Sequence, residues 1–262
     1  MSGLAELAAL RLQGGVAAPV AERVVEELPV ALRYNGSAYA VMLATPTDLD
    51  DFALGFSLSE RIIDHADELG PVVCEPGPAG VVIEMAIPQA RFERIEPRRQ
   101  AFGGTSGCGL CGTGTLQAAL RPVPPVADRL RVEVADIHRA LDALVGCQPL
   151  NAACGGVHAA AHVDRQGTMT VREDVGRHNA LDKLVGALAR RDAGPGFVLM
   201  SSRASYEIVH KAACAGIELV VAISAPTALA IRTAEAAGIT LVAFARDRAM
   251  NIYSGARRIR RC

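Results

Sequence analysis

The chain has few aromatic residues and no excess of either charge. Its 262 residues include no Trp, only 4% are aromatic, and the formal net charge is −1. Scarce aromatic residues disfavour a stacking platform for single-stranded nucleic acid, and a balanced charge disfavours binding to a polyanion. We therefore expect no nucleic-acid partner.

Long hydrophobic runs are missing as well. No apolar stretch reaches the roughly 18 residues that suggest a membrane span, and the first residues lack the basic start of a signal peptide. We expect a cytoplasmic protein that has no membrane partner. In that reducing compartment the seven cysteines are not expected to form a disulfide framework.

The first third of the chain has the pattern of a small α+β domain, which we place at residues 26–100. Two alternating apolar runs flank Asn35 and Gly36, a favoured two-residue hairpin turn. Thr47, with Asp50 three residues later, is typical of a helix start, and an apolar stripe follows it. A second pair of strands then completes a hairpin–helix–hairpin unit.

Two stretches are expected to lie outside the domains. Residues 1–25 are rich in Ala and carry few structural signals, so we expect a loose N-terminal arm. Residues 101–126 combine a glycine-rich segment with a proline-rich break, and the polar residues 91–104 connect them to the first domain. We interpret residues 101–126 as a loop and linker.

The second half of the chain predicts a larger domain over residues 127–262. A helical stripe and a strand pair lead into a further helix, and apolar runs then begin at Phe197, Leu219 and Leu241, each 22 residues after the last. Continuous apolar strands that alternate with helices indicate a parallel sheet covered on both faces. The predicted fold class is therefore α/β with two domains.

Polar residues follow these three strands. In open parallel sheets, ligands bind beyond the carboxyl ends of the strands, where helix N-termini favour anions. We expect a nucleotide or phosphate pocket at this edge, although helix capping alone explains any single one of these turns. The candidate binding residues at the three strand ends are Ser202, Arg203, Ser224, Thr227, Arg246 and Arg248.

A second group of candidates lies between the strand pair and the helix that follows it. Arg177 and His178 either face cofactor phosphates or belong to a capped, salt-bridged helix start. His158 follows two glycines that permit close approach of a ligand or a neighbouring chain, and the same two interpretations apply to it. Asp182 and Lys183, one turn farther along, are expected to be structural.

The segment GGTSGCGLCGTG, residues 103–114, holds Cys108 and Cys111 as a Cys-x-x-Cys pair. Its glycines leave few apolar neighbours, which disfavours two ordinary buried thiols. Three further interpretations stay open: half of a zinc site completed by Cys154 and His158, a thioredoxin-like redox pair, and a sulfur carrier whose thiolate takes the outer sulfur of a persulfide. The motif alone does not choose between them.

Longer strings of the sequence resemble the FdhD family, which are accessory sulfurtransferases for formate dehydrogenase. The matching strings are TSGCGLCG, GGVHAAA, REDVGRHNALDKLVG, SSRASYEIVHKA, AISAPTALAI and GITLVAFAR, and the resemblance runs from about residue 26 onward. It implies a C-terminal domain similar to cytidine deaminase, which is an α/β/α sandwich with a mixed sheet. It also implies a homodimer, and no structural metal is expected.

The resemblance further implies a chemistry. A cysteine desulfurase passes persulfide sulfur to Cys108, with Cys111 as the second thiol. The sulfur then moves to a molybdenum (or tungsten) bis-guanine-dinucleotide cofactor, a bound substrate destined for formate dehydrogenase. The family's guanine-nucleotide segment matches Phe244, Ala245, Arg246, Asp247, Arg248 and Ala249. A cofactor-binding chaperone without sulfur transfer is the alternative function.

Two positions depart from the family's pattern. Cys154 stands where Thr is expected and Ser202 stands where Gly is expected, which leaves the ligand preference open. Hydrolytic deamination is not expected, because Ala160 replaces the Glu of a deaminase His-x-Glu motif that would begin at His158.

Overall fold

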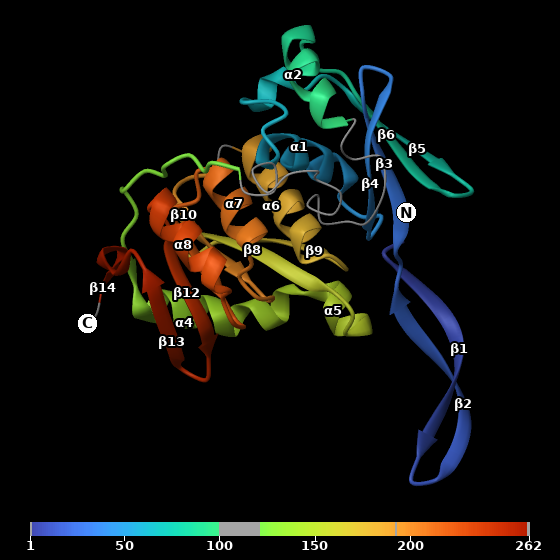
Figure 1. The fold of residues 1–262 in the computed structure, drawn as a ribbon. Helices are drawn as coiled ribbons and strands as arrows, with labels where there is room; N and C mark the ends of the chain where they lie inside the picture. The colour runs from blue at the N-terminus through green and yellow to red at the C-terminus, as the bar shows by residue number, and fades with distance from the viewer. Residues whose placement is uncertain (1, 100–120, 192, 261–262) are drawn as a thin grey trace.

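The computed structural model describes residues 2–99, 121–191 and 193–260, which form two packed units and a projecting hairpin (Figure 1). The first unit contains β3 (Leu28–Tyr34), β4 (Ser37–Ala44), α1 (Leu49–Ser59), β5 (Val72–Gly77), β6 (Gly80–Met85) and α2 (Gln89–Arg99). The second unit contains β7 (Val132–Glu133), α4 (Val134–Leu144), α5 (Pro149–Cys154), β8 (His158–Asp164), β9 (Met169–Asp174), α6 (Arg177–Arg191), β10 (Gly196–Met200), α7 (Tyr206–Cys214), β11 (Leu219–Ala222), α8 (Ala228–Ala237), β12 (Thr240–Arg246), β13 (Ala249–Ser254) and β14 (Ile259–Arg260). Among the helices of the described ranges, none combines the length and apolar character needed to cross a membrane.

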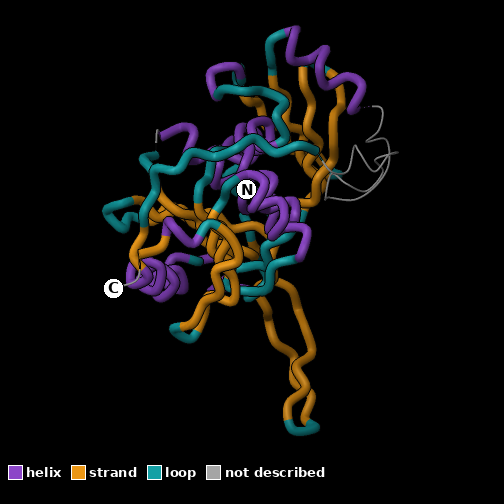
Figure 2. Tube along the Cα trace, turned by 60° about the vertical axis from the view of Figure 1, so that its left-hand side comes forward, coloured by secondary structure: helices purple, strands orange, loops and turns teal. Residues whose placement is uncertain are grey.

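The projecting hairpin corrects the expectation of a loose arm. β1 (Leu4–Gln13) and β2 (Val16–Val25) pair antiparallel, and Figure 2 shows them as a narrow ribbon of strand that leaves the body. The turn consists of Gly14 and Gly15, whose φ angles are 57° and 83°. A two-residue hairpin turn requires this left-handed backbone, which Gly adopts without steric cost. The Gly pair was therefore the signal, and the surrounding Ala residues obscured it.

Helix α2 is a second correction. The polar stretch expected as a connector is helical, and its Ile95 is only 1% exposed. The charged residues do not oppose this packing, because Arg91 forms ion pairs with Asp64 and Glu68 of the first unit. Helix α2 therefore buries Ile95 and turns its described charged residues outward. These charged residues gave the stretch the polar composition that was interpreted as a connector.

The first unit is built on a sheet whose described strands have the order β4-β3-β6-β5, with α1 packed against one face. The hairpin turn predicted at Asn35 and Gly36 is confirmed, with φ angles of 49° and 78°. The helix start predicted at Thr47 is wrong by one residue, because Thr47 is not the N-cap. Helix α1 instead begins after Asp48, whose φ of 51° is left-handed and whose side chain makes no capping hydrogen bond.

The second unit is a three-layer α/β/α sandwich with a mixed sheet, as predicted. Its described strands have the order β13-β12-β11-β10-β8-β9, with β10, β11 and β12 parallel and β8 antiparallel to β10. Val198 and Met200 pack with α6, α7 and α8, whereas Phe197 and Leu199 pack with α4 on the other face. Both faces are covered, which is why these strands are continuous apolar runs.

The two units meet where α1 crosses α6. A Cβ atom on Gly55 of α1 would lie 1.7 Å from the carbonyl oxygen of Asp182, and one on Gly186 of α6 would lie 1.9 Å from the carbonyl oxygen of Asp51. No side chain fits between two helices that approach so closely. The two backbones are therefore in direct contact at this crossing.

Buried charges reinforce the crossing. Lys211 of α7 lies 2.8 Å from Glu60, at the end of α1, and 2.9 Å from Asp182 of α6, and all three residues are less than a tenth exposed. Burial alone would lower the pKa of Lys211, but the two carboxylates overcome this effect and raise that pKa above its ordinary value. Lys211 thus stays charged and joins the two units.

Replacing Gly55 by Ala is expected to destabilise the protein by more than about 2 kcal/mol, because the helices must separate to admit the methyl group. Urea unfolding of the full chain measures the loss. Gly146→Ala is the matched control, because nothing lies within 4 Å of a Cβ atom built there. Equal stability of the two variants would contradict a direct contact between the helices.

Because His210 is buried, we expect the folded protein to lose stability in mild acid. Burial, with a smaller contribution from the charge of Arg121, lowers the pKa of His210 from 6.5 to about 4. In this interval the unfolded chain binds the proton and the folded chain does not. Stability therefore falls as the pH drops from about 6.5 to 4, by up to about 1.4 kcal/mol per pH unit.

Thermal unfolding at several pH values between about 7 and 5 measures this slope. His210→Gln is expected to flatten it, whereas His65→Gln, at an exposed position, is expected to leave it unchanged. A slope that is insensitive to the loss of His210 would reject this explanation.

Candidate functional site

The carboxyl edge of the mixed sheet gathers most of the residues predicted to bind a cofactor. Strands β10, β11 and β12 end at this edge, and β8 begins there because it runs antiparallel to β10. Helices α6, α7 and α8 also begin at this edge, since each follows a strand that ends there. The predicted residues at this edge are His158, Arg177, His178, Ser202, Arg203, Ser224, Thr227 and Phe244.

Hydrogen bonds between neighbouring turns join this edge into a continuous seam. The Ala159 N–H donates to the Ser201 hydroxyl (2.8 Å), and the Ser224 N–H donates to the Ser202 carbonyl (3.4 Å). The Phe244 N–H in turn donates to the Ser224 carbonyl (3.1 Å). Each turn is therefore held by the next, so the polar groups along the seam keep fixed relative positions.

Two hydroxyl groups of the seam serve the fold itself. The Thr227 hydroxyl accepts a hydrogen bond from the Ala230 N–H (3.2 Å) and caps α8. The Ser202 hydroxyl donates to the Arg203 carbonyl (3.1 Å), and Ser202 is 4% exposed. Helix capping thus accounts for the Thr227 side chain, and the extra side chain of Ser202 is bonded within its own turn.

The segment 244–249 corrects a predicted strand end. The sequence indicated a turn into a helix after this strand, but β12 continues to Arg246 and returns as β13. The turn consists of Asp247 and Arg248, with φ angles of 52° and 58°. The Arg248 guanidinium pairs with Asp142 of α4 (2.8 Å), and both side chains are exposed. A hairpin tip therefore replaces the expected helix N-terminus.

The remaining residues of this segment separate into two groups. Phe244 belongs to the seam, where its backbone is left-handed (φ 52°) and 37% of the residue is exposed. Ala245 is buried in the core beneath α4. Arg246 and Ala249 pair across the hairpin and are both exposed. Of this segment, Phe244 is therefore the residue that the seam includes.

His158, Arg177 and His178 form a group at the start of α6. His178 Nε2 lies 2.7 Å from Glu207 Oε2 and 3.5 Å from the Ser205 hydroxyl. Burial, followed by the charges of Arg177 and His178, lowers the pKa of His158 below its ordinary value, so this ring is neutral at pH 7. The Arg177 Nε is buried and has no hydrogen-bond partner among the described residues. A guanidinium N–H without a partner at a helix start is suited to an anion.

Asp174 holds this group in position. Its carboxylate accepts hydrogen bonds from the N–H groups of Gly176 (2.8 Å) and Thr45 (3.0 Å) and from the Asn179 side chain (3.0 Å), and it pairs with Lys183 (2.7 Å). Thr45 follows β4, so both units fix the turn from which α6 begins. The complete burial of Lys183 agrees with its predicted structural role. Sequence reasoning missed Thr45, because a partner 129 residues away leaves no local pattern.

Cys108 and Cys111 lie outside the described residues. The described chain resumes at Arg121, whose N–H donates to the Tyr206 hydroxyl (3.0 Å) and whose guanidinium binds Glu60 (2.7 Å). Tyr206 is the first residue of α7 and directly follows a turn of the seam. The sequence that carries the two cysteines therefore rejoins the fold beside the candidate site.

In the zinc interpretation, Cys154 and His158 would complete a site begun by Cys108 and Cys111, which lie outside the described residues. The Cys154 thiol donates to the Leu150 carbonyl (3.1 Å) at the end of α5. Within the described residues no cluster of three or more His, Cys, Asp or Glu side chains is arranged to hold a metal ion. The Cys154 thiol therefore makes an ordinary hydrogen bond at the end of a helix.

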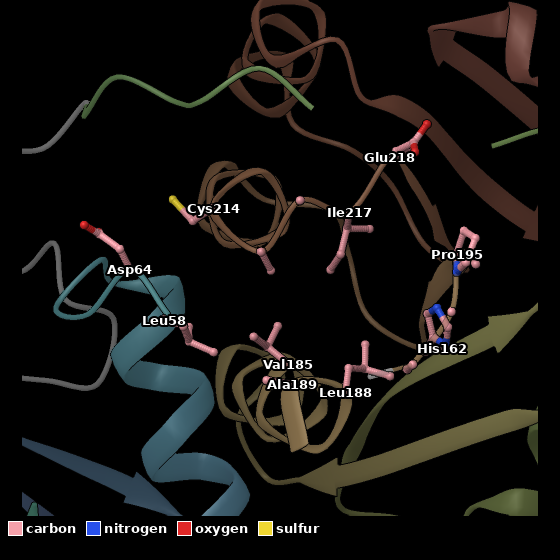
Figure 3. Close-up of a pocket in the computed structure, with 15 residues that line it drawn as sticks. Leu58, Asp64, His162, Val185, Leu188, Ala189, Pro195, Cys214, Ile217 and Glu218 are labelled. Atoms are coloured by element: carbon pink, nitrogen blue, oxygen red, sulfur yellow. The ribbon is translucent and has the colours of Figure 1, made fainter. Parts of the chain in front are cut away.

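A cavity of about 430 Å³ lies at the opposite edge of the sheet (Figure 3). Leu58, Val185 and Ile217 contribute apolar walls, and His162 and Cys214 line it as well. None of the predicted site residues that the structure describes lines this cavity. The sequence predicted a site at the carboxyl ends of the parallel strands. This cavity lies at the opposite edge of the sheet, where β10 begins and β8 ends.

The sequence matches the model of the FdhD/NarQ family over residues 25–260. It is 52% identical over 252 residues to the sulfur carrier protein FdhD of Xanthomonas euvesicatoria pv. vesicatoria (strain 85-10), a match that covers 95% of this chain and 90% of that protein. The sulfur carrier protein FdhD of Bordetella petrii is 49% identical over 261 residues, which are 98% of this chain and 94% of that protein.

A solved structure extends the likeness to the fold. The crystal structure of a proposed formate dehydrogenase accessory protein from Desulfotalea psychrophila superposes with a TM-score of 0.77 at 24% identity, covering 99% of this chain and 100% of that one. At this identity the likeness shows a shared fold. Because the sequence matches extend over both units as well, the chain belongs to the FdhD/NarQ family.

Proposed function

We propose that this protein is a sulfur carrier that serves formate dehydrogenase. It takes sulfur from a cysteine desulfurase and transfers it to a molybdenum (or tungsten) bis-guanine-dinucleotide cofactor. The main support is the return of the cysteine-bearing sequence at Arg121, beside the start of α7 and the seam. The names of the relatives that are about half identical support the same function. A homodimer and a cytoplasmic location are part of this proposal.

Loading of sulfur requires no external oxidant. The Cys108 thiolate attacks the outer sulfur of the desulfurase persulfide, a new S–S bond forms on Cys108, and the desulfurase cysteine leaves as a thiolate. Cys108 then carries the sulfur as a persulfide.

Release of the sulfur requires two electrons, which Cys111 supplies. The Cys111 thiolate attacks the inner sulfur of the Cys108 persulfide, a disulfide forms between the two cysteines, and the outer sulfur leaves as hydrosulfide for the metal of the bound substrate. A dithiol reductant then restores both thiols for another cycle.

The seam binds the nucleotide ends of this substrate. Helices α6, α7 and α8 direct their N-terminal N–H groups and positive dipole ends to one edge, which favours phosphate. The unmatched Nε of Arg177 adds a charged donor, and the exposed Arg203 adds further positive charge. The partly exposed ring of Phe244 offers a flat surface for a base.

Incubation with a cysteine desulfurase and cysteine is expected to add one sulfur atom to the peptide that contains Cys108, as measured by mass spectrometry without reduction. Cys108→Ala is expected to abolish loading, whereas Cys111→Ala is expected to load sulfur and fail to release it. Cys147→Ala, at an exposed position, is the matched control. If Cys108→Ala still supports full formate dehydrogenase activity, the protein is a cofactor chaperone instead.

Arg177→Gln is expected to weaken the binding of guanosine diphosphate by roughly 10- to 100-fold, because a charge-assisted hydrogen bond contributes about 1.5–3 kcal/mol. Isothermal titration calorimetry measures the affinity. Arg191→Gln, at the exposed opposite end of the same helix, is the control. If the two variants bind guanosine diphosphate with equal affinity, the phosphate binds elsewhere. Sulfur loading of Cys108, measured in the same variants, separates this result from a failure of sulfur transfer.

A further inference from the structure

The cavity at the edge of the sheet opposite the seam lies between the two units. Leu58 of α1 forms one wall, Val185 and Leu188 of α6 form another, and Ile217, just before β11, forms a third. Figure 3 shows these four side chains around a common space. The volume of about 430 Å³ falls within the range of small-molecule sites. The apolar walls therefore surround enough space for a small organic ligand.

Asp64 and Glu218 are the carboxylates among the described residues that line this cavity, and both are neutralised by arginines. Asp64 pairs with Arg91 (2.5 Å), and Glu218 pairs with Arg258 (3.1 Å) and accepts a hydrogen bond from the Leu130 N–H (3.0 Å). Figure 3 shows both carboxylates turned away from the space between the apolar side chains. A charged ligand would lose its hydration in that space without gaining an opposite charge. The cavity therefore favours a neutral molecule.

The Cys214 thiol is a neutral part of the cavity wall. Burial, with a smaller contribution from the charge of Glu60, raises the pKa of Cys214 to about 11, so the thiol keeps its proton at pH 7. Its sulfur lies 3.8 Å from Nδ1 of His210. Because a protonated thiol is a poor nucleophile, this cavity is suited to binding rather than to sulfur chemistry.

His162 lines the cavity and has no hydrogen-bond partner for its ring among the described residues. It lies on β8 and is only 7% exposed. Burial, opposed by the charge of Asp164, lowers the pKa of His162 below its ordinary value. The ring is therefore neutral at pH 7 and offers one N–H donor and one nitrogen acceptor. Leaving such groups unpaired is costly, so the cavity is suited to a ligand that supplies the missing hydrogen bond.

We propose that this cavity binds a neutral, largely apolar molecule that carries one hydroxyl group. A hydroxyl group both donates and accepts a hydrogen bond, so it can pair with either nitrogen of the His162 ring. The rest of the ligand replaces water against Leu58, Val185 and Ile217, which the hydrophobic effect favours. Because the cavity and the seam lie at opposite edges of the sheet, this inference depends neither on nucleotide binding nor on sulfur transfer.

A ligand in this cavity contacts both units at once. Leu58 belongs to α1 of the first unit and precedes the buried Glu60 by two residues, whereas His162 and Val185 belong to the second unit. The unfolded chain has no such site, so the ligand binds the folded protein in preference. A saturating ligand is therefore expected to raise the temperature of thermal unfolding.

Fluorine NMR of the full chain titrated with 4-fluorophenol tests the site. The probe is expected to bind saturably, with a dissociation constant of about 1 mM or lower. His162→Phe keeps a ring but removes the hydrogen bond, so it is expected to weaken 4-fluorophenol about tenfold. The same substitution is expected to leave the affinity for 4-fluorotoluene, in which a methyl group replaces the hydroxyl, undiminished. His138→Phe on α4, outside the cavity, is the matched control.

Filling the cavity provides an independent test. Leu188→Trp is expected to abolish binding of both probes, Ala189→Trp at an exposed position of the rim repeats this test, and thermal unfolding verifies that each variant is folded. Saturating guanosine diphosphate is expected to leave the affinity for 4-fluorophenol unchanged, because the seam lies at the other edge. No saturable binding, equal losses of the two probes in His162→Phe, unchanged binding in both Trp variants, or displacement by guanosine diphosphate would each overturn the inference.

Discussion

The direct backbone contact between α1 and α6 is the constraint on which the candidate site depends. At Gly55 and Gly186 the two helices meet without an intervening side chain, and this contact places the first unit on the second. The start of α6 carries Arg177 and His178 at the sheet edge. The helix that supports the first unit therefore also presents the site, and any displacement at the crossing displaces these side chains relative to the seam.

The contact at the two glycines leaves the relative orientation of the two units open. The buried charges determine that orientation. Apolar packing is not directional, whereas a buried ion pair requires defined geometry and is costly to leave unpaired. One cluster joins Lys183 and Asp174 to Thr45 of the first unit, and another joins Lys211 to Glu60. Because both clusters span the two units, one docking orientation satisfies them together.

Local periodicity predicts the strands and helices well, and it fails where partners are distant in the sequence. The apolar run at Phe197 was recognisable because a strand buried on both faces differs in composition from its surroundings. The arm was missed because strands exposed on both faces show no alternation, and the carboxyl-edge rule placed most candidate residues but mistook the hairpin at 244–249 for a helix start. The contacts of Asp174 with Thr45 connect residues far apart in the chain, so no local pattern records them.

The buried cluster at Glu60 connects the proposed carrier to the proposed site. Glu60 binds both Arg121, where the cysteine-bearing sequence rejoins the fold, and Lys211 of α7, while Tyr206 at the start of α7 accepts a hydrogen bond from the Arg121 N–H. Twelve residues lie between Cys108 and Arg121 in the sequence, so this anchor is the first described position after the cysteine pair. In the proposed function, the ion pair between Arg121 and Glu60 therefore fixes the point where the cysteine-bearing sequence rejoins the fold, beside the α7 start that borders the substrate site, although the pair touches no reacting atom.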